Sequence, residues 1–268
     1  MYIPENYKEL NKQTWNKKVE YHYQSEFYDV ESFLQGKNVL TPIELKLLGD
    51  IEGKSILHLQ CHFGLDTISL SRMGASVVGV DFSDIAIEKA TELATQENAN
   101  ARFIECDVLE LDKHLDEKFD IVFTSYGTIG WLDDLQQWAR IIKHFLKTGG
   151  RLIFAEFHPV VWMFSDQFDS IQFSYFKGDP IIEKESGSYA DREAEIQTES
   201  VSWNHSISEV MQALLSEGLS IKDFNEYDYS PYNCFLNSEE FEKGKWRITH
   251  FENKIPMVYS IVAENGNL

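Results

Sequence analysis

The 268-residue chain has few cysteines, no long apolar run and no apolar segment at its N-terminus. Its three cysteines, Cys61, Cys106 and Cys234, are widely spaced, and no CxxC pair occurs. Neither a disulfide framework nor a zinc site is therefore expected. No stretch approaches the roughly 18 uncharged apolar residues of a membrane helix, and the first residues lack the apolar core of a signal peptide. These absences predict a cytoplasmic protein that has no membrane segment and no bound metal.

Basic residues are also scarce. The chain has 24 Lys and Arg residues against 44 Asp and Glu residues, which gives a net charge of −20. A nucleic-acid partner requires a cationic surface that displaces counterions, and an anionic lipid surface attracts basic clusters. The charge balance therefore argues against nucleic acid and membrane partners.

Apolar residues make up 43% of the chain, enough for a sizeable core, and short apolar runs alternate with stretches of helical length. Strands separated in this way form parallel βαβ units, and right-handed crossovers then give a doubly wound sheet. Two further runs near the C-terminus complete a predicted seven-stranded, mostly parallel sheet. The predicted strands are Ser55–Leu59, Ser76–Val80, Ala101–Glu105, Phe119–Thr124, Arg151–Phe157, Leu219–Phe224 and Met257–Ala263.

Several helix ends can be read directly. Thr41-Pro42-Ile43-Glu44 and Ser206-Ile207-Ser208-Glu209 have the pattern of capping boxes. Ser83 is placed to cap the helix after the second strand, and Asp133 or Asp134 the helix after the fourth. The pair Gly149-Gly150 is expected to end that later helix.

The chain divides into four predicted segments within one structural domain. Residues 1–50 form a helical cover, 51–159 the α/β core, 160–204 an insertion after the fifth strand, and 205–268 the completion of the sheet. The insertion begins with an aromatic run over residues 162–176 and continues as an acidic, turn-rich segment. Two interpretations stay open, an ordinary packed insertion or a lid that lines an apolar acceptor site.

Ligands of doubly wound sheets bind beyond the carboxyl ends of the strands. Asp81 ends the second strand, where a carboxylate can accept both ribose hydroxyls of an adenosyl ligand. The alternative is that Asp81 only caps the following helix, although Ser83 is better placed to do so. Asp107, with the Val108 amide, could bind an adenine ring, or Asp107 could be an ordinary turn residue.

The loop after the first strand, Gln60-Cys61-His62-Phe63-Gly64, contains a single glycine. A dinucleotide site needs G-x-G-x-x-G so that bare backbone can approach the pyrophosphate. S-adenosylmethionine has no phosphate, and its carboxylate requires only a few amides or polar side chains. The loop therefore disfavours a nicotinamide-dependent oxidoreductase.

Four segments together resemble class I S-adenosylmethionine-dependent methyltransferases, in the subgroup whose first motif reads HLQCHFGxDT. They are residues 56–67, Gly79-Val80-Asp81-Phe82-Ser83, Phe119-Asp120-Ile121-Val122 and Thr148-Gly149-Gly150. The resemblance implies a Rossmann-like methyltransferase fold, S-adenosyl-L-methionine as the cofactor and methyl transfer to a small-molecule acceptor. The implied cofactor-binding residues are His58, Gln60, Cys61, Gly64, Asp66, Thr67, Asp81, Phe82, Ser83, Asp107, Val108, Ser125 and Tyr126, with His22 closing over the cofactor.

The first motif departs from the usual family pattern at three positions. His58 stands where the family carries an acid, and Gln60 and His62 stand where it carries glycines. In the family that acid helps to hold the methionine ammonium. Here backbone carbonyls near His58 and Ser125, or the Asp66 carboxylate, could take its place.

Catalytic candidates follow from the end of the fifth strand. Alternation places Glu156 and His158 on the same side of the chain, and a carboxylate beside an imidazole would raise its pKa and orient it as a general base. His205 could face the same cleft, and each histidine could instead be purely structural. A non-catalytic protein that binds S-adenosylmethionine or S-adenosylhomocysteine is the alternative to an enzyme.

Overall fold

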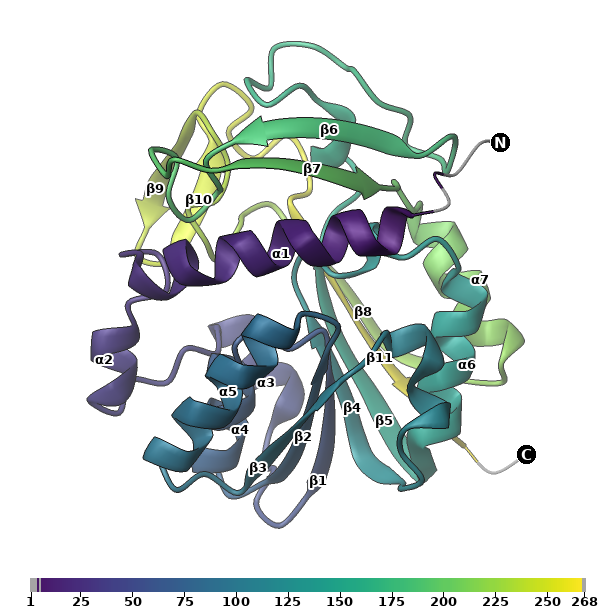
Figure 1. Cartoon of the computed structure of the whole chain (residues 1–268). Helices are drawn as coiled ribbons and strands as arrows, with labels where there is room; N and C mark the ends of the chain where they lie inside the picture. Colours follow the sequence, from purple (N-terminus) through teal and green to yellow (C-terminus); the bar gives the residue numbers. More distant parts are fainter. Residues whose placement is uncertain (1–3, 5, 267–268) are drawn as a thin grey trace.

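The computed structural model describes residue 4 and residues 6–266, so the outermost residues of the first and last predicted segments lie outside it. A seven-stranded sheet with the strand order β3-β2-β1-β4-β5-β11-β8 forms the centre (Figure 1). All strands run parallel except β11, which is antiparallel to both of its neighbours. The bounds are β1 Ser55–Leu59, β2 Ser76–Asp81, β3 Ala101–Glu105, β4 Phe119–Ser125, β5 Leu146–Phe157, β8 Ser220–Tyr227 and β11 Val258–Glu264. The predicted fold is confirmed.

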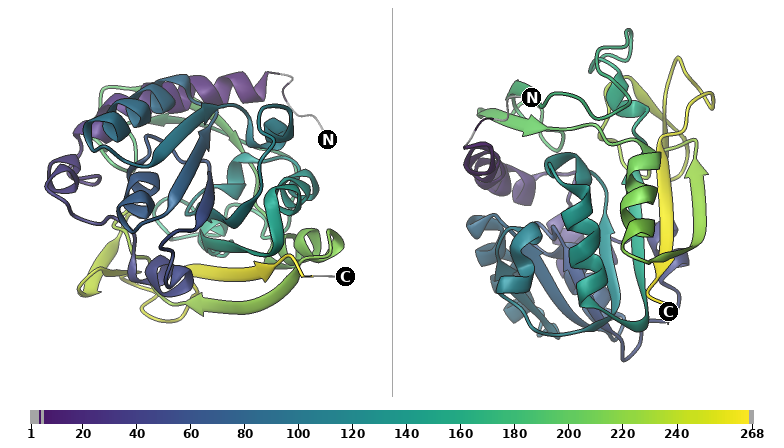
Figure 2. Two further views of the ribbon diagram at one scale, coloured as in Figure 1. Left: turned by 90° about the horizontal axis from the view of Figure 1, so that it is seen from below. Right: turned by 90° about the vertical axis from the view of Figure 1, so that its right-hand side faces the viewer.

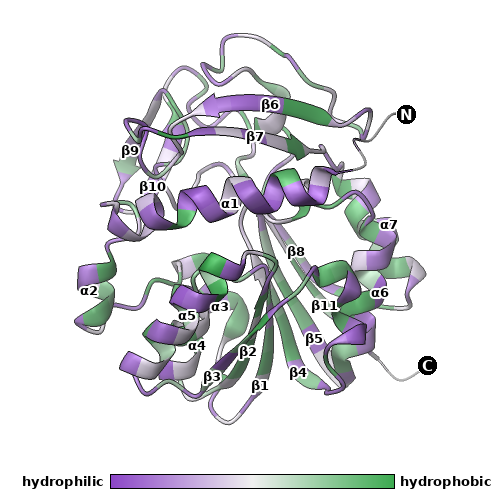
Figure 3. Cartoon of the chain, in the orientation of Figure 1, coloured by the Kyte–Doolittle hydropathy of each residue, from purple (hydrophilic) through white to green (hydrophobic). Residues whose placement is uncertain are grey.

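Helices cover both faces of the sheet. Helices α6 (Leu135–Phe145) and α7 (Ile207–Ser216) pack on one face, and α3 (Pro42–Leu48), α4 (Leu65–Arg72) and α5 (Asp84–Gln96) lie on the other side (Figure 1). The strands between these helices consist largely of hydrophobic residues, as the colouring of Figure 3 shows, and most of these residues are buried. These two layers fix the carboxyl ends of the strands at one edge of the sheet.

Most of the predicted helix ends are confirmed. Thr41 and Glu44 form the capping box, with the Thr41 amide 2.6 Å from Glu44 Oε2. Ser83 and Asp134 cap α5 and α6. Ser206 caps α7, but the Glu209 carboxylate lies 3.1 Å from Nδ1 of the preceding His205.

The prediction that Gly149-Gly150 ends α6 was wrong. The helix ends at Phe145 and β5 begins at Leu146, so both glycines lie within the strand. Gly149 has φ 75°, and a Cβ on Gly150 would lie 2.9–3.2 Å from carbonyl oxygens of Lys147, Phe119 and Asp120. Gly149 therefore supplies the left-handed backbone conformation, and Gly150 allows the close approach of β4 at the irregular start of the β4–β5 pairing.

A second layer lies beyond the carboxyl ends of the strands. Helix α1 (Tyr7–Gln24) crosses this edge and separates the core from a hairpin made by β6 (Ile181–Ser186) and β7 (Gln197–Ser202) (Figures 1 and 2). The short helix α2 (Val30–Leu34) follows α1, and a hairpin of β9 (Ser238–Glu242) and β10 (Lys245–Ile248) lies toward the side of the molecule opposite α1 (Figure 2). Neither hairpin was predicted. We call α1 together with the β6–β7 hairpin the cover.

Candidate functional site

A cavity of about 960 Å³ lies between the carboxyl ends of the strands and the cover. This volume is at the upper end of the range of roughly 300–1,000 Å³ for small-molecule sites. Most of the predicted cofactor-binding residues line it: His58, Gln60, Cys61, Gly64, Asp66, Asp81, Phe82, Ser125 and Tyr126. The predicted residues His22, Thr67, Ser83, Asp107 and Val108 do not form part of its wall.

The loop after β1 has backbone conformations that favour glycine. Gln60 has φ 55° and His62 has φ 49°, in the left-handed region that favours glycine. The Gln60 side-chain amide donates to the Thr128 carbonyl at 2.8 Å. Its Oε1 is buried in the cavity wall without a hydrogen-bond partner. The loop thus offers an acceptor atom to a ligand.

Asp81 has the geometry of a diol-binding carboxylate. Its Oδ2 accepts the His62 amide and its Oδ1 the Ser83 amide, each at 2.9 Å. A carboxylate has about four lone-pair sites. Both oxygens can therefore accept further hydrogen bonds from a ligand in the cavity. Burial raises the pKa of Asp81 to about 6, which leaves it ionised at neutral pH. The cap of α5 is Ser83, whose hydroxyl accepts the Ala86 amide at 3.1 Å.

Asp107 has the contacts of a capping residue. Its Oδ1 accepts the Leu109 amide at 2.9 Å, and its Oδ2 lies 2.6 Å from Lys8 Nζ of α1. Asp107 thereby begins the short 3₁₀ helix Val108–Lys113. The adenine-binding role of Asp107 and Val108 stays a prediction.

Asp66 is the carboxylate suited to an ammonium group. The His58 ring is neutral and carries no charge of its own, because burial lowers its pKa to about 3, and its Nδ1 lies 2.8 Å from the Thr67 hydroxyl. Asp66 lines the cavity, and burial raises its pKa, opposed by a hydrogen bond with Ser125. Behind it, burial and the Asp66 charge raise the pKa of Glu44. A cation beside this pair would stabilise its ionised form.

Glu156 holds the loop after β4. Its carboxylate accepts the amides of Thr128 at 2.7 Å and of Ile129 at 3.2 Å, together with the Gly127 amide and the Thr128 hydroxyl. The side chain is only 2% exposed. Burial raises its pKa while these amides lower it. Glu156 thus fixes the loop that forms the neighbouring cavity wall.

The predicted pair of Glu156 and His158 was wrong. His158 Nε2 instead lies 2.9 Å from Glu226 Oε1, and Nδ1 accepts the Val160 amide at 3.2 Å. Burial lowers the pKa of His158, although Glu226 opposes this, whereas a raised pKa was expected. Because β5 ends at Phe157, the alternation of a strand no longer applies, and the His158 ring is not part of the cavity wall.

His205 lies at the cavity wall, before α7. Its side chain is buried, and Nε2 donates to the Leu132 carbonyl at 2.8 Å. A carbonyl only accepts, so Nε2 carries a hydrogen. Nδ1 faces Glu209.

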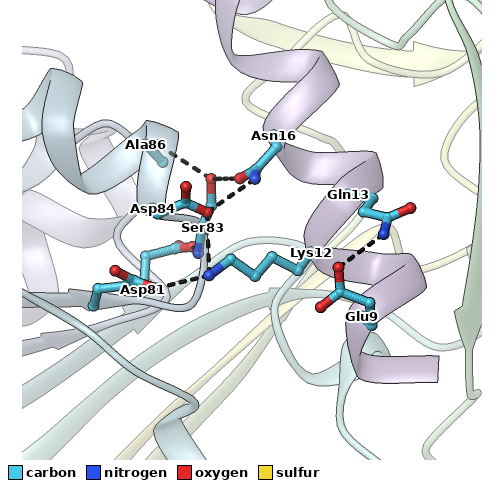
Figure 4. Close-up of polar contacts among 9 residues, drawn as sticks. Glu9, Lys12, Gln13, Asn16, Asp81, Ser83, Asp84 and Ala86 are labelled. Atoms are coloured by element: carbon cyan, nitrogen blue, oxygen red, sulfur yellow. Dashed lines mark hydrogen bonds and ion pairs between the residues drawn. The ribbon is translucent and has the colours of Figure 1, made fainter. Parts of the chain in front are cut away.

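Helix α1 binds the core through polar contacts that the sequence did not indicate. Asn16 contacts the Ser83 hydroxyl at 2.6 Å and Asp84 at 2.9 Å (Figure 4). Lys12 lies 3.1 Å from Asp84 and 2.7 Å from Glu105. These contacts hold α1 against the residues that end β3 and follow β2.

His22 reaches the site only through another residue. It is fully buried, and Nδ1 lies 3.0 Å from Nε2 of His62, which lines the cavity. Sequence reasoning missed His62, since its loop position gave no sign of a partner on α1. In the described part of the chain, no group of three or more His, Cys, Asp or Glu side chains is arranged to hold a metal. No helix among these residues is both long and apolar enough to cross a membrane.

Comparisons with known proteins agree with this geometry. Residues 56–150 match the family model described as a methyltransferase domain. A ubiquinone biosynthesis O-methyltransferase of Coxiella burnetii is 29% identical over 121 residues, 44% of this chain and 51% of the relative. A demethylmenaquinone methyltransferase of Lactococcus lactis is 33% identical over 138 residues, covering 50% and 52%. The chain thus spans about half the length of these curated relatives.

Solved structures extend the likeness over nearly the whole chain. A S-adenosylmethionine-dependent methyltransferase of Clostridium acetobutylicum has a TM-score of 0.58 at 15% identity, covering 96% of this chain and 99% of its own. The DhpI complex with S-adenosylhomocysteine also has a TM-score of 0.58 at 15% identity, covering 99% and 100%. The expected methyltransferase fold is confirmed.

Proposed function

We propose that the protein is an S-adenosylmethionine-dependent methyltransferase acting on a small molecule. The observation that carries the proposal is one continuous cavity that joins the Asp81 carboxylate to an aromatic wall around Phe157 and Trp162. It offers space for a second ligand beside an adenosyl group. The matched methyltransferase domain and the two quinone-pathway names among its relatives support both parts of the proposal.

Asp81, Asp66 and Gln60 are the residues assigned to hold the cofactor. Asp81 would accept hydrogen bonds from the ribose hydroxyls, the Asp66 carboxylate would pair with the ammonium group, and the unpaired Gln60 Oε1 would accept a further hydrogen bond. When bound, the cofactor supplies an electrophilic methyl group. The chain then has to orient the acceptor and exclude water, and the cover is placed to do so.

The acceptor region has acidic residues above aromatic rings. Glu183 and Glu185 of β6 line the cavity, and Asp166 lies in the same wall. Burial, Glu185 and Asp166 all raise the pKa of Glu183, whereas Lys18 is 3.3 Å from Glu185. An anionic acceptor would add to this repulsion. We therefore infer a neutral or cationic acceptor.

Where an acceptor must lose a proton, we assign the base to His205, which lines the cavity whereas His158 does not; Nδ1, beside Glu209, is the nitrogen that would take the proton, because Nε2 already carries the hydrogen donated to Leu132. Glu156 then acts by holding the loop over Gly127–Ile129 rather than by touching the acceptor. The free thiols of Cys61, Cys106 and Cys234 support the proposed cytoplasmic location.

The activity can be tested by incubating the protein with S-adenosylmethionine tritiated in the methyl group and a fractionated metabolite extract. We expect a labelled small-molecule product from the wild type and little from Asp81→Ala. Tight cofactor binding without any labelled product would favour a non-catalytic binder, and the absence of both would contradict the proposal.

A further inference from the structure

Three segments far apart in the sequence meet at His22. Its Nδ1 lies 3.0 Å from His62 Nε2 in the loop after β1, and its Nε2 lies 3.1 Å from the Ser188 hydroxyl in the turn between β6 and β7. The rings of Tyr28 and Tyr189 pack against His22, with centroids 5.3 and 4.9 Å away. The His22 side chain thus joins α1 to the loop after β1 and to the β6–β7 hairpin.

The hydrogen bonds that run from Ser188 through His22 to His62 have a defined direction. Ser188 Oγ accepts the amides of Ala190 and Asp191, each at 3.2 Å, which engages both of its lone pairs. Its hydroxyl hydrogen is therefore the one donated to His22 Nε2. His22 must then carry its hydrogen on Nδ1 and donate it to His62 Nε2. His62 in turn carries its own hydrogen on Nδ1.

The surroundings keep both rings neutral, as this order requires. Burial, with a smaller contribution from the Lys18 charge, lowers the pKa of His22 to about 2 and that of His62 to about 3. Lys18 itself pairs with Glu185 of the hairpin. The hydroxyls of Tyr28 and Tyr189 lie 2.5 Å apart, and burial raises the pKa of each, so they are neutral. The Asp66 carboxylate adds to the raised pKa of both tyrosines.

His62 transmits this arrangement to Asp81. Its backbone has φ 49°, a strained conformation for a side chain of this size, and its amide donates to Asp81 Oδ2 at 2.9 Å. The His62 ring is held by His22 and by Trp15, whose ring centroid is 5.3 Å away. Fixing the ring fixes the peptide, and the peptide orients the carboxylate.

We propose that His22 is a positioning residue, which through His62 holds the Asp81 carboxylate in the orientation that binds the ribose diol. Through its contact with Ser188, His22 also links this orientation of Asp81 to the position of the β6–β7 hairpin. The inference rests on the proposed function, because it takes an adenosyl group as the ligand of Asp81. His22, although it lies outside the cavity wall, thereby controls cofactor affinity by donating one hydrogen bond.

Calorimetry with S-adenosylhomocysteine tests the donor role. His22→Phe keeps the ring volume but removes the donor, and it should weaken binding by about tenfold. His22→Asn places an amide donor where Nδ1 stands and should recover most of the affinity. Wild-type affinity in a folded His22→Phe variant, or no recovery in His22→Asn, would overturn the inference. If the wild type itself does not bind S-adenosylhomocysteine, the proposed function is what fails.

Nitrogen-15 NMR of the histidine rings gives a second readout that needs no ligand. His22 and His62 should both appear as neutral rings protonated on Nδ1, with His62→Gln and His22→Asn used to assign the signals. A ring protonated on Nε2 at either position would contradict the hydrogen-bond order.

Discussion

The α/β core and the cover are held together in different ways. In the core, strands such as β1 and β2 are buried almost throughout, and the residues that pack between layers are apolar. In the cover, the buried residues of α1 include Asn11, Thr14 and Lys18, and this helix is largely hydrophilic in Figure 3. The difference shows that this molecule builds its scaffold by apolar burial and closes its cavity by polar contacts.

The largest effect should come from the core. Phe154 of β5 is completely buried and packs edge-on against Trp138 of α6, with centroids 5.4 Å apart. Phe154→Ala should lower the free energy of unfolding by about 3–5 kcal/mol, because it removes apolar contacts and leaves a cavity. Urea denaturation measures this loss, and a loss below 1 kcal/mol would show that the core is not close-packed there.

Removing a buried polar side chain from the cover should lower the free energy of unfolding by less than the core substitution, and its effect should be local. The Asn11 side chain accepts the Val201 amide and donates to the Val201 carbonyl, both at 2.8 Å. Asn11→Ala leaves these buried groups unpaired, at a cost of about 1–3 kcal/mol. Hydrogen exchange should rise in α1 and β7 but not in β4.

Gln13 provides the matched control for that variant. It lies on the exposed side of α1, where its amide contacts Glu9 at 2.8 Å (Figure 4). Gln13→Ala should leave exchange in β7 unchanged. An equal rise in β4 on Asn11→Ala would mean that core and cover open as one unit.

Acid should weaken cofactor binding through the junction of the two regions. Burial raises the pKa of Asp81 to about 6, so this carboxyl becomes protonated as the pH falls through 6 and accepts hydrogen bonds less well. The affinity for S-adenosylhomocysteine should therefore be full near pH 7.5 and decline below pH 6, by at most about tenfold per pH unit. Calorimetry between pH 7.5 and 5 measures the decline, and a flat profile would contradict the role of Asp81.

The smallest effect is expected at the rim of the cover. Lys12 pairs with Asp84 and Glu105, whose side chains are about half exposed. Exposed ion pairs contribute about 0.2–1 kcal/mol and are screened by salt. Lys12→Ala should thus change the melting temperature only slightly, and less in high salt. A loss comparable to that of Asn11→Ala would show that charge, rather than buried hydrogen bonding, holds the cover.

The same contrast explains what could be predicted from the sequence. The core strands are recognisable in the sequence as apolar runs. The helix caps Ser83 and Thr41 and the position of Asp81 at the end of β2 could be predicted from local patterns at helix and strand ends. The β6–β7 hairpin could not be predicted in this way, because its residues are mostly polar and its strands are defined by their pairing with each other.

Side-chain partners across the fold were the least predictable feature. Glu156 was expected beside His158, whereas its carboxylate binds amides of the loop after β4 and His158 contacts Glu226 of β8. Likewise, the contact of His22 with His62 joins residues 40 positions apart. Periodicity within one strand or helix carries no information about such pairs.

The central claim is that Asp81 binds the ribose of an adenosyl cofactor, and titration of S-adenosylhomocysteine into three proteins tests it most directly. The wild type should bind, Asp81→Ala should bind at least about tenfold more weakly through loss of charge-assisted hydrogen bonds, and Asp84→Ala should differ from the wild type by less than about twofold. Asp84 is the matched control because it lies three residues further along the chain and outside the cavity wall. No binding by the wild type, or equal affinity in a folded Asp81→Ala variant, would contradict the account.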